Sequence, residues 1–219
     1  MRHIWWFSAV LMLAFVGLAQ AADQVPALAS DDIILGKAEA PITIFEYASL
    51  TCPHCAEFDE ATFPKVKSEW IDAGKAKLVF RDYPLDQMAL KAAMVARCAP
   101  PERFFSFIDV LFHSQTSWAT AGGPDQVTQA LSRIARLGGL SEEKFDSCVA
   151  DKAMSDRILN ERLVAQNQYG VDSTPTFFIN GKKVVGALSY DDFAKKLSDA
   201  MASAGTLRLG AAAPVVGNE

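Results

Sequence analysis

Residues 49–55 read SLTCPHC and directly follow PITIFEYA at residues 41–48, an apolar run rich in β-branched side chains. The run predicts a strand, and the residues after the second cysteine have helical character. Cys52 and Cys55 therefore stand where a strand gives way to a helix. Two cysteines at this spacing fit a redox dithiol, half of a zinc site or a structural bridge.

The N-terminal residues predict export. Arg2 precedes the uncharged run IWWFSAVLMLAFVGL, and AQA at residues 19–21 fits a small-x-small cleavage site. A membrane anchor would need a longer apolar run with a basic flank. We therefore expect a signal peptide over residues 1–21 and a mature chain, residues 22–219, in an oxidising compartment where disulfides persist.

Composition sets the class of protein. The chain has 219 residues, 50% of them hydrophobic, and a formal charge of −5 without a long run of either sign. This predicts a folded protein of one or two domains and argues against a nucleic-acid partner.

The rest of the pattern predicts an α/β sheet with an inserted all-helical domain at about residues 86–155. The expected order includes two βαβ-type crossovers and a C-terminal hairpin that turns at Asn180 and Gly181. The first half of the chain is expected to form strands at 41–48 and 75–83, with a helix over 53–72 between them that is kinked at Pro64. Helices over 86–169 are expected to follow. The chain is then expected to form the two hairpin strands, a helix at about 190–203 and a flexible tail at 206–219.

A helix N-terminus stabilises a thiolate, because its unpaired N–H groups and dipole favour negative charge. Cys52 has this position, Pro53 presets the first turn, and His54 can add a donor or a positive charge. We expect Cys52 to be the exposed nucleophile of thiol–disulfide exchange and the more buried Cys55 to be the resolving thiol.

The two other readings of the cysteine pair fit less well. Zinc needs two more ligands, and Cys98, Cys148 and His113 do not have a matching spacing. A bridge across so short a loop constrains the unfolded chain little. We therefore expect a redox dithiol and no metal.

The stretch FEYASLTCPHC resembles the active-site strand and helix start of the thioredoxin-fold family. CPHC combined with a helical insertion is similar to the DsbA-type periplasmic thiol:disulfide oxidoreductases. This resemblance implies that the Cys52–Cys55 disulfide is transferred to reduced or unfolded exported proteins in the periplasm without an organic cofactor. It also implies reoxidation by a DsbB-like, quinone-linked membrane protein.

The resemblance extends to a second segment. STPTFFING at residues 173–181 matches the cis-proline loop of the family, which implies that Thr174 and Pro175 lie beside Cys52. Strongly oxidising DsbA enzymes carry valine where this chain has Thr174, and reducing or isomerising relatives often carry threonine. A reductase or isomerase is therefore the alternative, and a redox-inactive chaperone-like module is disfavoured by the intact dithiol. Only residues 22–41 precede the first full strand, which favours a monomeric oxidase over an isomerase with a dimerisation segment.

Three further residues are candidates for supporting roles. An even number of cysteines permits a structural disulfide between Cys98 and Cys148. Alternation places Glu46 on one strand face with Ile42 and Ile44, under the helix that starts at Cys52. Its offset from Cys52 also resembles the buried acid of the family, so we expect Glu46 to exchange a proton with Cys55.

Overall fold

The computed structural model describes residues 24–211 and contains a mixed sheet of five strands in the order β1-β3-β2-β4-β5. β2 and β3 pair in parallel, whereas the other neighbouring strands pair antiparallel. The strands are β1 (Ile34–Gly36), β2 (Ile42–Ala48), β3 (Ala76–Asp82), β4 (Thr176–Ile179) and β5 (Lys182–Val185). The predicted fold class, a thioredoxin-like α/β sheet with a helical insertion, is confirmed.

The second of the two expected parallel crossovers is wrong. The helical insertion begins after the C-terminal end of β3 and returns the chain to the same end of the sheet. β4 therefore starts beside the C-terminal end of β2 and runs antiparallel to it. This return has a functional consequence, because it brings the start of β4 next to the end of β2, where the cysteine pair begins.

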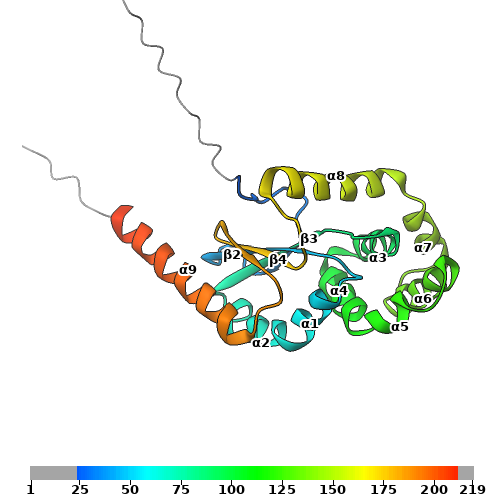
Figure 1. Cartoon of the computed structure of the whole chain (residues 1–219), viewed down its shortest axis with the longest axis horizontal. Helices are drawn as coiled ribbons and strands as arrows, with labels where there is room; N and C mark the ends of the chain where they lie inside the picture. The colour runs from blue at the N-terminus through cyan, green and yellow to red at the C-terminus, as the bar shows by residue number, and fades with distance from the viewer. Residues whose placement is uncertain (1–23, 212–219) are drawn as a thin grey trace, which may run out of the picture.

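Helices surround the sheet and form the insertion (Figure 1). Before β3 the chain forms α1 (Pro53–Ala61), α2 (Phe63–Val66) and a π-helical turn, η1 (Lys67–Ile71). Between β3 and β4 it forms α3 (Gln87–Arg97), η2 (Pro101–Arg103), α4 (Phe104–His113), α5 (Gln115–Ala119), α6 (Pro124–Leu137), α7 (Glu142–Val149) and α8 (Lys152–Tyr169). The expected end of the insertion near residue 155 falls inside α8, a single helix, and α9 (Tyr190–Ala211) closes the described chain.

The two faces of the sheet are covered by different helices (Figure 1). On one face, Ile42 and Ile44 of β2 pack with Phe58 of α1 and Phe193 of α9. On the other face, a cluster joins β2 to the C-terminal part of α8 and contains Phe45, Tyr47, Val79, Tyr83, Ala165, Val171 and Phe178. Both faces are therefore buried, and alternate residues of β2 point toward different helices.

Two local expectations need correction, and the sequence pattern gave no sign of one strand. The helix expected over 53–72 is divided at Thr62, whose hydroxyl donates to the Leu188 carbonyl oxygen at 2.8 Å. A new helical segment starts at Phe63, with Pro64 in its first turn, where proline is tolerated. The edge strand β1 is too short to give a periodic signal, so it was not predicted. Residues 206–211 belong to α9 instead of a tail, because this stretch is rich in good helix formers and lacks proline.

Two expectations fall on residues that the structure does not describe. These are the signal peptide at residues 1–21 and the last part of the expected tail, residues 212–219. Within residues 24–211, none of the helices has the length and apolar character needed to cross a membrane.

The insertion contains a disulfide between Cys98, at the end of α3, and Cys148 of α7. Their Cα atoms are 6.1 Å apart, and the bond joins residues separated by 50 positions. It therefore ties together two helices of the insertion that are distant in the sequence.

We predict that this disulfide supports stability and not turnover. In the chain-entropy model, closing a 50-residue loop contributes about 4 kcal/mol. Replacing both Cys98 and Cys148 with alanine should lower the thermal midpoint by about 10 °C. The rate of dithiol exchange at Cys52 should stay within about twofold of the parent. Calorimetry and an exchange assay on the same sample check this, and an unchanged midpoint would contradict it.

Candidate active site

The candidate active site is built where β2 ends, α1 begins and β4 begins. Cys52 is the N-cap residue of α1, with extended backbone angles, and Pro53 is the first helical residue. The Cys52 carbonyl oxygen accepts hydrogen bonds from the backbone N–H groups of Cys55 (3.1 Å) and Ala56 (3.2 Å). The expected position of the cysteine pair at a helix N-terminus is therefore observed.

A loop with a cis peptide bond between Thr174 and Pro175 lies against the first cysteine. The Cys52 thiol donates to the Thr174 carbonyl oxygen at 3.4 Å. Cys52 is only 5% exposed and Cys55 is fully buried. The expectation of an exposed Cys52 is therefore wrong, because the neighbouring loop contacts its sulfur.

The pKa values of the two thiols are shifted in opposite directions. The Cys55 thiol donates a hydrogen bond to the Cys52 sulfur, which is the main cause that lowers the pKa of Cys52 to about 5 in spite of burial. The Thr174 side chain and the backbone N–H groups of Cys55 and His54 lower this pKa further. Burial, followed by the interaction with Cys52, raises the pKa of Cys55 far above its usual range. One sulfur is thus a thiolate at neutral pH, and the other is a thiol.

The side chain of His54 does not have the position expected for it. Its ring is 73% exposed, and Nδ1 lies 3.2 Å from the Glu57 carboxylate one turn along α1. The His54 contribution to the low pKa of Cys52 comes from its backbone N–H. The N–H groups at the helix N-terminus therefore stabilise the Cys52 thiolate, a role that the sequence suggested for the imidazole of His54.

Glu46 is buried beneath the dithiol. It is 4% exposed and is paired in register with Phe80 of β3 and Phe177 of β4. Burial, followed by the negative charge of Asp59, raises its pKa to about 8. The Glu46 charge in turn contributes to the raised pKa of Cys55. A carboxyl group that titrates near neutral pH is therefore electrostatically coupled to the buried thiol.

Sequence reasoning missed Gln115, a buried side chain from α5 of the insertion. Its Nε2 donates to the carbonyl oxygens of Leu50 (2.9 Å) and Cys52 (3.0 Å). The insertion therefore holds the turn before α1 directly. No local pattern marks a lone glutamine for this task, so only the three-dimensional structure could reveal it.

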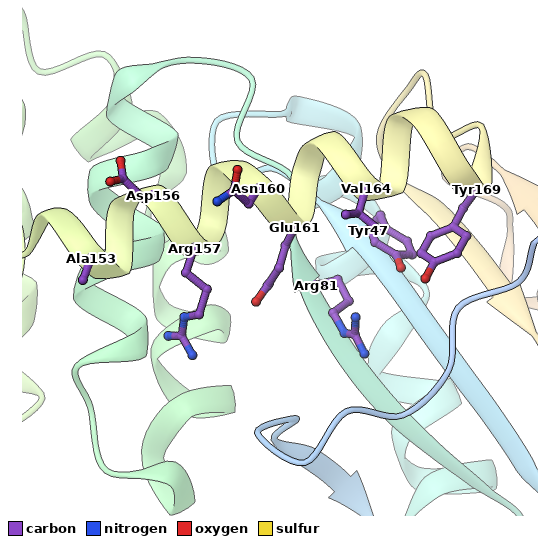
Figure 2. A pocket seen from close by; sticks show the side chains of 9 residues that line it. All are labelled: Tyr47, Arg81, Ala153, Asp156, Arg157, Asn160, Glu161, Val164 and Tyr169. Carbon is purple, nitrogen blue, oxygen red and sulfur yellow. The ribbon is translucent and has the colours of Figure 1, made fainter.

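A cavity of about 430 Å³, lined in part by charged side chains, lies on the other face of the sheet, between Tyr47, Arg81 and one side of α8 (Figure 2). Tyr47 follows Glu46 directly in β2, so their side chains point to opposite faces. Figure 2 shows the hydroxyl groups of Tyr47 and Tyr169 close together, with Arg81 nearby. This cavity is therefore separated from the dithiol by the sheet.

Two of the candidate ligands for a zinc site are excluded in this structure. Cys98 and Cys148 are bonded to each other and cannot complete a site with Cys52 and Cys55. The third candidate, His113, forms a group with Asp59 and Asp109 in which the possible ligand atoms lie within 4.8 Å of one another.

The fold and the paired cysteines agree with comparisons to known proteins. A thioredoxin family model matches residues 29–199. The crystal structure of Wolbachia pipientis α-DsbA1 is 36% identical with a TM-score of 0.77, and the match covers 84% of this chain and 96% of that chain. The chain belongs to the DsbA type of the thioredoxin family.

Other relatives of this DsbA-type chain are more distant or longer. A Rickettsia prowazekii protein assigned as a protein-disulfide oxidoreductase is 32% identical over 173 residues, which is 78% of this chain and 62% of the relative. The chain thus spans about three-fifths of the length of the first curated relatives that it matches. BdbD from Bacillus subtilis shares the fold, with a TM-score of 0.66 at 22% identity over 78% of this chain and 92% of BdbD.

For this DsbA-type chain, we predict that Thr174→Val raises the pKa of Cys52. The Thr174 hydroxyl oxygen is buried without a hydrogen-bond partner in the thiol form, yet it is one of the groups that lower the Cys52 pKa. It is therefore free to donate to the sulfur once the thiolate forms, and valine removes that donor. The thiolate absorbance near 240 nm, followed against pH, gives the pKa. An unchanged midpoint would exclude the hydroxyl from the site.

Proposed function

We propose that this protein is a periplasmic thiol:disulfide oxidase that transfers its Cys52–Cys55 disulfide to reduced or unfolded exported proteins. It acts as a monomer after removal of a signal peptide, and a DsbB-like, quinone-linked membrane protein reoxidises it. The catalytic residues are Cys52 and Cys55. Glu46 exchanges the proton, while Pro53, the backbone of His54 and the Thr174–Pro175 loop shape the site.

The observation that carries this proposal is the lowered pKa of Cys52 beside the raised pKa of Cys55. A stabilised thiolate favours the reduced protein, and a protein that is stable when reduced gives its disulfide away readily. The same thiolate is a good leaving group when the substrate completes its own disulfide.

A disulfide reductase or isomerase is the second candidate, and Thr174 is the observation that favours it. Such an enzyme would have a lower reduction potential, because its oxidised form would have to be the more stable one. The acidity of Cys52 argues for the oxidase.

The reduction potential and the relative stability of the two redox forms decide between the candidates. The pKa of Cys52 is lowered on folding from 9.0 to about 5, so its contribution to stability is complete above about pH 9, decreases as the pH falls from 9 toward 5, and is lost below about pH 5. At pH 7 the reduced protein should therefore be more stable than the oxidised protein by about 2.5 kcal/mol. Urea unfolding of both forms measures this difference. A more stable oxidised form, with a potential near the value of about −270 mV found for thioredoxin, would identify a reductase.

A further inference from the structure

Asp59 is a buried carboxylate one helical turn beyond the resolving cysteine. Cys55 and Asp59 are four residues apart in α1, so they lie on the same face of the helix. The Asp59 side chain is 9% exposed, and its Oδ2 atom is buried without a hydrogen-bond partner. A buried carboxylate oxygen without a hydrogen bond costs stability, which calls for an explanation in function.

Helix α4 places an imidazole in front of this oxygen. His113 Nδ1 lies 3.6 Å from Asp59 Oδ2 and 3.6 Å from Asp109 Oδ1. Nδ1 is also 3.0 Å from the backbone carbonyl oxygen of Asp109, one turn earlier in α4. The His113 side chain is 51% exposed. It therefore connects the buried carboxylate to solvent.

The groups that face Asp59 come from three elements. They are Glu46 of β2, Asp109 and His113 of α4, and Glu60 of α1 itself. Burial, followed by the charge of Asp109, raises the pKa of Asp59 to about 7, while His113 opposes this shift. The hydrogen bond to the Asp109 carbonyl is the main cause of a raised pKa at His113. Asp59 therefore exchanges its proton close to neutral pH, as Glu46 does, and His113 holds its proton to a higher pH than an ordinary imidazole.

We propose that Asp59 and His113 form a proton path that connects the buried Glu46 and Cys55 to solvent. Neither residue touches the reacting sulfur atoms, so both are relay residues and not catalytic ones. The inference rests on the proposed function, because Glu46 needs a route to solvent only if it exchanges a proton with Cys55 in each cycle.

The proton balance of the cycle shows why a path is needed. When a substrate thiolate attacks Cys52, the Cys52–Cys55 bond breaks, and Cys55 leaves as a thiolate that takes the proton of Glu46. A second substrate thiolate then forms the substrate disulfide and releases Cys52 as a thiolate. During reoxidation Cys52 attacks the disulfide of the oxidant, and Cys55 returns its proton to Glu46 before it displaces the oxidant's sulfur. In the reduced protein at neutral pH, the Glu46 carboxylate takes up a proton from solvent, because its pKa is about 8. Glu46 must release that proton to solvent again before it can accept the proton of Cys55, so one proton enters and one proton leaves the buried site in each cycle.

Two carboxylates and an imidazole could also hold a divalent cation. The position of His113 Nδ1 argues against this, because a 3.0 Å contact with a carbonyl oxygen requires a proton on that nitrogen. In this arrangement Nδ1, which lies 3.6 Å from Asp59 Oδ2, carries a proton that it can pass to Asp59 and is not free to bind a metal. The geometry therefore favours a proton path.

The test measures the rate at which glutathione disulfide reoxidises the reduced protein in a single turnover, in dilute buffer over pH 5–8 and in the presence of EDTA. His113→Ala changes an accessible side chain and should slow closure of the Cys52–Cys55 disulfide by about tenfold. Added imidazole should restore most of the rate. Alkylation of Cys52 should be unchanged, because it needs no proton from this path. Asp59→Asn should be equally slow but should not respond to imidazole.

Two comparisons separate a relay from a structural effect. In a Glu46→Gln background, His113→Ala should have no further effect, because residues of one path are not additive. Asp156→Asn is the matched control, since it removes one carboxylate from the exposed Lys152–Asp156 pair of α8 and should behave like the parent.

Failure of the relay can be told apart from failure of the proposed function. Three results would each overturn the relay. The first is a parent-like rate of disulfide closure in both His113→Ala and Asp59→Asn, and the second is an equal slowing by His113→Ala in the Glu46→Gln background. The third is a rate of closure that changes with Zn²⁺ and EDTA. A reducing potential would overturn the oxidase instead, and the proton path would still be measurable in that case.

Discussion

Replacing Cys55 with alanine is expected to reduce turnover to the uncatalysed rate and to trap covalent complexes with substrate. Cys52 would still form mixed disulfides, but no neighbouring thiol could resolve them. Incubation of Cys55→Ala with a disulfide-containing substrate, followed by non-reducing electrophoresis, should show stable adducts that dithiothreitol releases. Cys52→Ala is the matched control and should form none, because Cys55 is fully buried and remains a thiol.

The same assignment gives a quantitative result for the parent protein. At pH 6 a thiol with a pKa of about 5 is about nine-tenths ionised, whereas an ordinary thiol with a pKa of about 8.5 is ionised to about 0.3%. Lower basicity removes part of this advantage, because nucleophilicity falls with a Brønsted slope of about 0.4–0.5. Alkylation of Cys52 should therefore be about tenfold faster than that of a free model thiol, less any reduction from its limited accessibility. A mass spectrum that places the first label on Cys55 would contradict the assignment.

The second large effect is expected from Glu46→Gln, which should slow both half-reactions near neutral pH by about a hundredfold. The protonated acid supplies the proton that Cys55 needs as it leaves, and the carboxylate removes that proton before Cys55 attacks. Because the pKa of Glu46 is about 8, the parent's rate of disulfide closure should rise with pH up to that value. Stopped-flow measurements on Glu46→Gln should show a flat profile and an almost unchanged pKa for Cys52.

Glu46→Gln should at the same time stabilise the protein. The pKa of Glu46 is raised on folding, so the unfolded chain loses this proton more easily, and the residue destabilises the fold increasingly as the pH rises from about 4.5 toward 8. The variant should gain about 3 kcal/mol at pH 7 and less than about 1 kcal/mol at pH 4.5. A loss of stability at pH 7 would show that the carboxyl group is needed for packing instead.

The sequence was most informative where one short pattern determines both structure and chemistry. The run into Cys52, Pro53 and Cys55 predicts a strand, a helix N-terminus and an acidic thiol, and all three are present in the structure. The alternation that placed Glu46 under α1 needs only a period of two residues. Such features can be predicted because they depend on neighbours in the chain.

The features that were missed depend on distant residues or on weak local preferences. The low exposure of Cys52 follows from a loop more than a hundred positions away, and the hydrogen bonds of Gln115 cross from the insertion to the turn before α1. The direction of β4 depends on where the insertion returns to the sheet. His54 shows the opposite error, because its place between the cysteines suggested a charge effect that its backbone supplies.

The two edge strands of the sheet also limit self-association. β1 has only three residues, and β5 begins with the exposed lysines Lys182 and Lys183. Open sheet edges are templates for strand addition, and short edges or lysine side chains are common protections against it. A protein that we propose meets extended, partly folded chains is exposed to this hazard in every cycle. The sheet edges should therefore resist aggregation with the same polypeptides that the dithiol is proposed to oxidise.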